Sequence, residues 1–164
     1  MPNGQYPPLT LAEWQQTRDT IHLYARLLGK VRQTLTPRLR HWWHVSLRTT
    51  ATGLTTTPMP AADQTIEMQL DFVNHTMVVY SSKGDSIRFA LDGQSPAVFR
   101  DDALAGLKSI GIVPDIDHSI WESTTPGAYD KVAVSRFWQA LSQIDALLKE
   151  FKGEHRQETS PVQL

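Results

Sequence analysis

The feature that most constrains the fold is an alternating pattern that begins near residue 66. Apolar and polar side chains alternate along this segment: Ile66, Glu67, Met68, Gln69, Leu70, Asp71 and Phe72. A period of two is typical of a strand that buries one face and exposes the other. Two more apolar segments, 77–81 and 87–91, follow after turn residues at 74–75 and 83–85. The pattern predicts an antiparallel meander with one polar face.

Three segments with helical periodicity surround these strands. The first spans about residues 10–36 and ends at Pro37, and its capping box is formed by Thr10 and Glu13. The second begins at Ser95, which is followed by a proline at the first helical position, and ends at Gly111. The third spans about residues 130–152. Amphipathic helices of this kind can cover the apolar face of an antiparallel sheet.

We therefore predict an α+β fold in which three helices cover one face of a four-stranded antiparallel meander. The first predicted strand is the segment 41–48, and residues 112–113 are predicted to add a short edge strand before the last helix. The predicted order is α, β, β, β, β, α, short β, α. At 164 residues the chain fits one domain. That domain is predicted over residues 10–153, between a flexible lead-in at 1–9 and a frayed tail at 154–164.

The segment from Lys30 to Thr57 concentrates the chemistry of the chain. It holds two of the five tryptophans, two of the six histidines and five Lys or Arg residues, without a carboxylate. In a strand its side chains would point alternately to two faces. Trp43, Val45 and Leu47 would meet the core. The opposite face would present Trp42, His44, Ser46 and Arg48, and that mixed polar face could hold a ligand.

This stretch also carries a family resemblance. GKVRQTLTP followed by HWWHVSLRTTATGLTT resembles a family of uncharacterised, mainly bacterial proteins called domain of unknown function 5996. Segments 70–91, 95–112 and 128–141 are similar to the same family, in the same order. The resemblance implies that members continue past a Ser-Pro-Val like that at 160–162 into a second half, so this chain corresponds to the N-terminal half. It also implies an Asn where this chain has Arg40, and it supplies no reaction.

Composition narrows the function classes. Residues 1–56 carry seven Lys or Arg against two acids, a net charge of +5, whereas residues 57–164 carry nine against fifteen, −6. We interpret the asymmetry as two parts of one fold that complement each other. A pI near 6.6 disfavours nucleic acid as a partner. The absence of cysteine excludes disulfides, and the sequence shows no signal peptide and no membrane-spanning run. We expect a soluble cytoplasmic protein.

The candidate site residues lie on the predicted polar face of the sheet. His44 could act as a general base oriented by Asp71, and these two are the candidate catalytic residues. The candidate ligand-binding residues are Arg40, Trp42, Arg48, Glu67 and Arg88. No metal site is predicted, because residues three apart on a strand point to opposite faces and so His41 and His44 cannot bind one ion. The residues name no cofactor.

One further cationic feature lies on the first helix. Arg18, His22, Arg26 and Lys30 are spaced four apart and form a ridge on one face of that helix. We interpret this ridge as a solvated surface.

Two functions from different classes fit these residues. In the first, the polar sheet face binds a small anionic or polar molecule and could catalyse a reaction on it. In the second, the domain is a non-enzymatic interaction module that forms a homodimer or packs against a second half of the family's longer proteins. The Trp-Trp pair suits both, because tryptophan is common in pockets and in interfaces.

Overall fold

The computed structural model describes residues 6–157 and 159–163. The described residues form three helices and one sheet. The helices are α1 (Leu11–Leu35), α2 (Pro96–Ser109) and α3 (Lys131–Glu154). The strands are β1 (Arg48–Thr49), β2 (Gly53–Thr55), β3 (Met59–Ala61), β4 (Gln64–Asp71), β5 (Thr76–Ser81) and β6 (Ser86–Ala90). Two short 3-10 turns, η1 (Arg40–Trp42) and η2 (Ser119–Trp121), complete the elements. The predicted α+β class is confirmed.

The sheet is antiparallel throughout, in the order β1-β2-β4-β5-β6. The short strand β3 pairs with the start of β4, whereas β2 pairs with its end. The predicted meander is confirmed for β4, β5 and β6. Its register places Met68 opposite Val79 and Leu70 opposite Met77, and all four side chains are buried. The apolar positions of the alternating pattern therefore form the core face of the sheet, as the period of two predicts.

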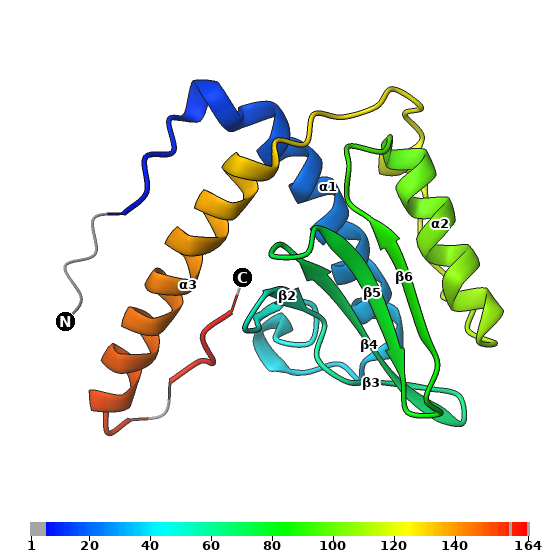
Figure 1. The fold of residues 1–164 in the computed structure, drawn as a ribbon. Helices are drawn as coiled ribbons and strands as arrows, with labels where there is room; N and C mark the ends of the chain where they lie inside the picture. The colour runs from blue at the N-terminus through cyan, green and yellow to red at the C-terminus, as the bar shows by residue number, and fades with distance from the viewer. Residues whose placement is uncertain (1–5, 158, 164) are drawn as a thin grey trace.

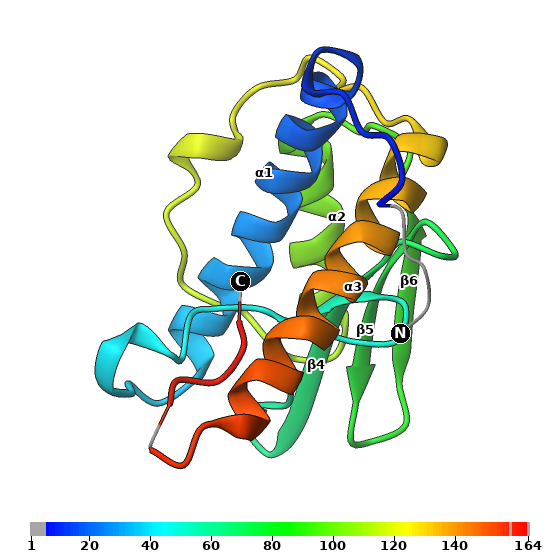
Figure 2. The same ribbon diagram turned by 90° about the vertical axis from the view of Figure 1, so that its left-hand side faces the viewer.

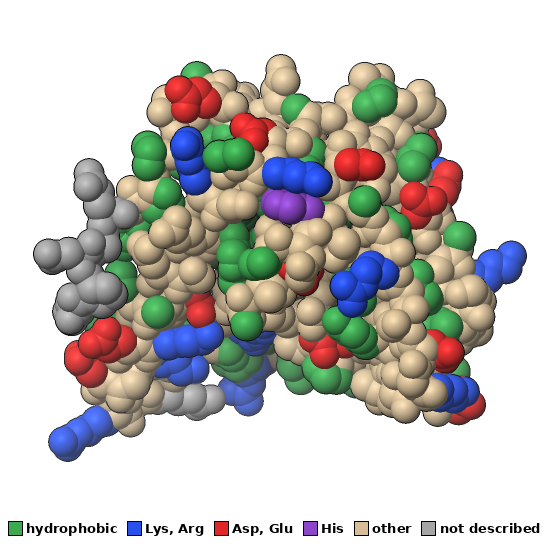
Figure 3. All heavy atoms as spheres, viewed as in Figure 1, with side chains coloured by type: hydrophobic (Ala, Val, Ile, Leu, Met, Phe, Trp, Pro, Cys, Tyr) green, Lys and Arg blue, Asp and Glu red, His purple; other side chains and the backbone are tan. Residues whose placement is uncertain are grey.

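The helices are placed unevenly around the sheet. In Figure 1 the helices α1 and α2 lie behind the sheet, and α3 runs along its side. Figure 2, seen from that side, shows α3 in front of α1. The face of the sheet turned toward the viewer in Figure 1 is the polar one, and Figure 3 shows it as mainly uncharged surface with scattered charged and apolar side chains.

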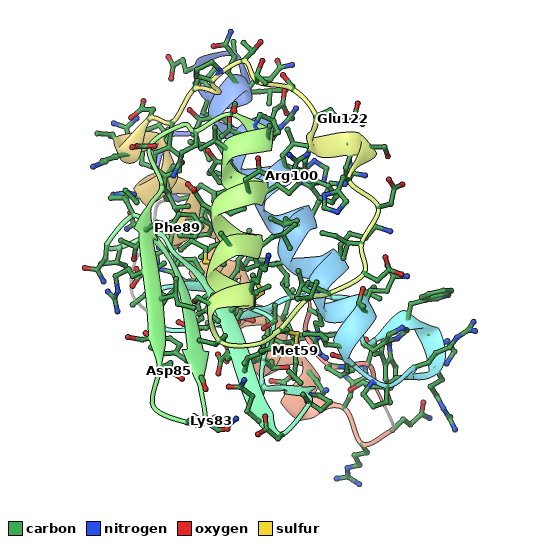
Figure 4. The ribbon with its side chains drawn as sticks, turned by 90° about the vertical axis from the view of Figure 1, so that its right-hand side faces the viewer. Met59, Lys83, Asp85, Phe89, Arg100 and Glu122 are labelled. Carbon is green, nitrogen blue, oxygen red and sulfur yellow. The ribbon has the colours of Figure 1, made fainter. Side chains whose placement is uncertain are left out.

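The core lies between the sheet and the helices. Phe89 on β6 reaches toward α2, where its ring meets that of Phe99 at a centroid distance of 5.6 Å (Figure 4). Leu27, Leu28 and Val31 on α1 are completely buried. Phe72, just after β4, contacts the rings of Phe137 and Trp138 on α3. Each helix thus contributes one apolar face, which is the arrangement that its periodicity predicts.

The predicted strand at 41–48 is wrong. Residues 40–42 form η1, and both His41 and Trp42 have positive φ angles, 55° and 59°. The turn is closed by backbone bonds from Trp43 to Arg40 and from Val45 to Trp42, with N···O distances of 3.3 and 3.0 Å. Only β1 at the end of the segment is extended. Local turn bonds have overridden the strand preference of a segment that contains two tryptophans and a valine.

The predicted edge strand at residues 112–113 is also wrong. The backbone N–H of Ile112 donates to the carbonyl of Leu107 at 3.0 Å, and that of Gly111 donates to Lys108, also at 3.0 Å. With Gly111 at a φ of 81°, these bonds form a Schellman motif that ends α2. Ile112 is buried as part of this helix cap, so its N–H is not free for a strand partner.

Two further sequence predictions concern helix starts. Ser95 caps α2 by accepting a bond from the N–H of Val98 at 3.3 Å, as predicted. Thr10 occupies the N-cap position of α1, but its side chain makes no capping bond, so the predicted capping box with Glu13 is wrong. The Glu13 N–H instead donates to the Thr10 carbonyl at 2.9 Å.

The ends of the chain extend past these elements. Residues 1–5 of the predicted lead-in, and residues 158 and 164 of the predicted tail, lie outside the described residues. Residues 159–163, which we call the 159–163 segment, run back along α3 toward β1 (Figure 1). Lys152 on α3 donates to the carbonyl of Ser160 at 2.9 Å. Among the described residues, no helix is both long enough and apolar enough to cross a membrane.

Candidate functional site: Arg32 and Arg48

The turn at η1 determines where the predicted site residues of the Trp-Trp segment lie. Trp42 is 53% exposed and carries the guanidinium of Arg38 over its ring at 4.9 Å. His44 is only 3% exposed, stacks on Trp42, and accepts a hydrogen bond at Nδ1 from the N–H of Leu39 at 3.3 Å. Arg40 is exposed. The expectation that Trp43 is core and His44 faces outward is wrong, because Trp43 is only half-buried and His44 is buried.

Four predicted site residues do share the polar face of the sheet. The strand register places Arg48, Glu67, Asp71 and Arg88 on the side opposite Met68 and Leu70. Arg48 and Arg88, however, lie on the two edge strands, β1 and β6. Four inter-strand spacings separate them, which amounts to roughly 19 Å. One small molecule cannot bridge both arginines.

The two carboxylates on this face are engaged in local structure. Glu67 accepts bonds at Oε1 from Thr55 at 2.6 Å and from Gln69 at 2.8 Å. Asp71 closes the turn after β4: its carboxylate accepts from the N–H groups of Val73 and Asn74, at 3.0 and 2.8 Å, and from the Asn74 amide. Within the described part of the chain, neither carboxylate makes a hydrogen bond to His44. The structure therefore does not join His44 and Asp71 into an acid–base pair.

A different cluster forms where α1 meets the segment before β1. Arg32, in the last turn of α1, is 6% exposed and donates through Nη1 to the carbonyl of Ser46. Its Nε is buried without a hydrogen-bond partner among the described residues. Burial lowers the pKa of Arg32 from its usual value, and the nearby charge of Arg48 lowers it further. A buried guanidinium with an unused donor is costly, and an anion would offset that cost.

Arg48 forms the second half of the cluster. Its Nη1 donates to the carbonyl of Val162 at 2.7 Å, and burial lowers the pKa of its guanidinium. The Ser46 hydroxyl donates to the side-chain oxygen of Gln163 at 2.6 Å. The 159–163 segment thus lies directly against Ser46 and Arg48. Thr49, next in the chain, is approached by Lys149 of α3 at 3.4 Å.

No carboxylate neutralises the Arg32–Arg48 pair among the described residues. The ion pairs within residues 6–157 and 159–163 are Arg18–Asp19, Lys83–Asp63, Arg100–Asp101 and Lys149–Asp145. Two guanidinium groups present rigid forks of donors that match carboxylate and phosphate oxygens. Away from bulk water, their attraction for an anion is stronger than at an exposed site. The cluster has the chemistry of an anion site.

Arg32 is the residue that the sequence-based site prediction missed. It lies four residues after Leu28 and one after Val31, both within the apolar stripe of the first helix. Residues four apart share a helix face, so this spacing predicts that Arg32 is drawn toward the core. A single cation on a buried face was the available signal. Arg32 is also one of five cations in the segment from Lys30 to Thr57, which hides its distinct position on the helix.

A second polar cluster lies at the turn between β4 and β5. The Nδ1 of His75 and the hydroxyl of Tyr129 are 3.1 Å apart. Burial lowers the pKa of His75, and the neighbouring charge of Lys131 acts in the same direction. Burial also raises the pKa of Tyr129. Within the described ranges, no group of three His, Asp or Glu side chains is arranged to hold a metal ion.

Fold and site together define a two-layer α+β domain with a buried basic cluster beside its edge strand. The model of a family of unknown function, DUF5996, matches residues 6–164, and the chain belongs to that family. The match runs along the whole chain and is not confined to an N-terminal part of it. No curated protein and no solved structure matches the chain.

Proposed function

We propose that this domain binds a small anion through a carboxylate or phosphate group at the Arg32–Arg48 pair. The observation that supports the proposal is the burial of Arg32, whose Nε has no partner while its charge has no carboxylate nearby within the described residues. The proposal keeps the predicted anionic ligand and keeps Arg48 as a contact. It moves the site from the middle of the polar face to its edge, where Arg32 joins it.

Each arginine has a distinct role in this proposal. Arg32 is held in place by the Ser46 carbonyl and offers its free Nε–H to the ligand. Arg48 is less buried and offers a second set of guanidinium donors. The 159–163 segment gives up its contact between Val162 and Arg48 when an anion enters. His44 and Asp71 hold turns in place, so the proposal is one of binding and includes no reaction.

The Arg48→Gln variant tests the proposal, with Arg88→Gln as the matched control from the opposite edge of the same sheet face. We expect inorganic phosphate and citrate to bind the native protein saturably in calorimetric titrations at low ionic strength. Loss of Arg48 should weaken binding by about tenfold or more, since a hydrogen bond to a charged group contributes at least about 1.5 kcal/mol. The control should change affinity by less than about twofold.

A nuclear magnetic resonance measurement makes this test specific to the site. The Nε–H resonance of Arg32 should move downfield when phosphate or citrate is added, because a donor without a partner gains an acceptor. Equal loss of affinity in both variants would show diffuse surface binding. An Arg32 Nε–H resonance that stays fixed while the anion saturates the protein would place the anion elsewhere.

A second candidate function, self-association, is supported by an exposed apolar face on α3. Ile144, Leu147, Leu148 and Phe151 are 43%, 47%, 48% and 60% exposed. Their spacing of three, four and seven places them on one side of the helix. An antiparallel pairing with a second copy would set Ile144 against Phe151 and Leu147 against Leu148. Such a pairing is symmetric about one two-fold axis, as an isologous dimer requires.

Sedimentation velocity tests the dimer with the Leu147→Glu variant. We expect the native protein to sediment as a dimer at high concentration and this variant as a monomer, because the pairing would bury two unpaired carboxylates. Val113→Glu is the control, since Val113 is 77% exposed on the connector after α2 and lies outside the α3 face. A native monomer at all concentrations would rule out this candidate and leave the anion proposal untouched.

A further inference from the structure

A groove runs between α1 and the segment that leads into the sheet. It has a volume of about 390 Å³, and its lining residues are His22, Ala25, Arg26, Gly29, Lys30, Gln33, Val45, Leu47 and Leu54. Figure 2 shows the last turns of α1 beside the cyan segment that follows it. None of these lining residues belongs to the Arg32–Arg48 site. The groove is therefore a separate feature of the molecule.

The floor of the groove is apolar and narrow. Leu47 and Leu54 are each 5% exposed and belong to the core, while Val45 is half-buried beside them. On the helix side the floor is formed by Ala25 and Gly29, two small residues one turn apart. A Cβ at Gly29 would lie 3.4 Å from the Val45 carbonyl oxygen, so α1 already lies close to the segment after it at this point. The space for an apolar side chain from outside is therefore the part of the groove beside Ala25 and above Leu47 and Leu54.

The rim of the groove is cationic. His22, Arg26 and Lys30, three members of the ridge on α1, are exposed and line one side. They occur one helical turn apart, so they span about 12 Å along the helix axis. None of the three takes part in an ion pair within the described chain. Lys30 donates to the amide oxygen of Gln33 at 3.3 Å, and its charge also acts on the carboxylate of Asp117. The fourth member, Arg18, pairs with Asp19 and lies outside the groove.

We infer that this groove is a docking site for an acidic amphipathic helix of a partner protein. Carboxylates spaced four residues apart on such a helix also repeat at about 6 Å, so three of them would face His22, Arg26 and Lys30 in turn. Apolar side chains next to that acidic row would enter the floor between Ala25, Gly29 and the core leucines. Helices dock into apolar grooves through side chains spaced three or four apart.

The linear array of charge is what selects a helix over a small molecule. A single carboxylate or phosphate could meet one or two of the cations and would leave the rest of the 12 Å rim unused. A helix that carries both an acidic row and an apolar row matches the rim and the floor together. The cationic ridge, interpreted above as a solvated surface, is thus reassigned to a binding role.

A designed peptide provides the probe. The peptide is a fluorescein-labelled helix with Glu at every fourth position and Leu on the adjacent face, and its control has Lys in place of each Glu. Fluorescence anisotropy with the native protein should show saturable binding of the Glu peptide and at least about tenfold weaker binding of the Lys peptide. Added salt should weaken binding of the Glu peptide, because the contacts on the rim are exposed charges.

Matched variants locate the contact. Arg26→Glu should weaken binding of the Glu peptide by about tenfold or more, whereas Arg18→Glu, on the same ridge but outside the groove, should change it by less than about threefold. Ala25→Leu fills the floor without changing charge, and it should weaken binding while the thermal melt of the variant stays native-like. Both charge variants lie on the exposed face of α1, so they leave the core unchanged.

Other outcomes would overturn the inference. Equal losses of affinity for the Glu peptide in Arg18→Glu and Arg26→Glu would show a general attraction to a basic helix and no specific contact in the groove. Equal affinity for the Glu and Lys peptides would show that the charge of the rim does not contribute to binding. Saturable binding of decanoate with no binding of the Glu peptide would assign the groove to a small anionic amphiphile. A dimer of the protein that is lost in Arg26→Glu would assign the groove to a second copy of the chain.

Discussion

Replacing Trp121 with alanine is expected to lower the free energy of unfolding by about 3–5 kcal/mol. Trp121 lies in η2, within the long connection between α2 and α3, yet it is completely buried. Its indole N–H donates to the carbonyl of Leu23 in α1 at 2.9 Å. The substitution removes the largest fully buried side chain of the chain and leaves a cavity that its neighbours fill only in part. Chemical denaturation monitored by circular dichroism measures the loss.

The matched control is Trp42→Ala, which removes the same side chain from an exposed position. Trp42 is 53% exposed, and its contacts are a stack on His44 and the guanidinium of Arg38. We expect its loss to cost less than about 1 kcal/mol. A Trp121→Phe variant should lose an amount of unfolding free energy between those of the two alanine variants. It keeps most of the ring volume but loses the hydrogen bond to the Leu23 carbonyl. Similar losses for Trp42→Ala and Trp121→Ala would contradict the burial of Trp121.

Trp121 also explains how the connection between α2 and α3 acquires a fixed path. The connection is rich in Pro, Asp, Ser and Thr, a composition that predicts an irregular segment but says nothing of its position. In the structure the indole anchors it to α1, and Arg100 of α2 donates to the Trp121 carbonyl at 3.0 Å. Figure 4 shows Arg100 on α2 beside the turn that ends at Glu122. The apolar residues in this polar segment, Trp121 among them, were the signal for this anchor.

The fold was predictable from the sequence wherever periodicity extended over many residues. The first and third helices show apolar spacing over about six turns. The strand at 76–81 carries three consecutive buried residues, whereas the strands at 64–71 and 86–90 alternate along most of their length. Long patterns of this kind reflect burial of one face, which is the main stabilising contribution to the fold. Length alone was not sufficient: the alternation at 41–48 covers eight positions, as many as β4, yet local backbone hydrogen bonds close a turn there.

The candidate site was harder to predict because its residues are brought together by long-range packing. Arg32 and Ser46 are 14 positions apart, and Ser46 meets Gln163 across 117 positions. No motif of fixed spacing links such residues, since each is placed by a different element. Arg48 was found because it lies in the conspicuous basic segment. Glu67 and Arg88 were placed on the correct face of the sheet, but alternation specifies a face and says little about which residues are neighbours on it.

The two proposed binding features share one structural base, the segment 45–48. Val45 and Leu47 line the groove beside α1, while Ser46 and Arg48 belong to the anion site. This segment is placed by α1 on one side and, through β1, by its pairing with β2 on the other. Its position therefore depends on the close approach of β2 to β4. A variant that moves β2 should disturb both features.

The Gly53→Ala variant is expected to destabilise the protein by about 3 kcal/mol or more, because the added methyl group has no space. A Cβ at Gly53 would lie 1.9 Å from the Leu70 carbonyl oxygen and 3.2 Å from the Phe72 nitrogen, both in the backbone. To make room, β2 must move away from β4, and β1 with Arg48 moves with it. Gly153→Ala is the control, since a Cβ there meets nothing within 4 Å, and we expect a change of less than about 1 kcal/mol. Denaturant unfolding of both variants measures the difference.

Phosphate titration of any folded Gly53→Ala protein should show weakened binding. Full stability of that variant would contradict the close pairing of β2 with β4.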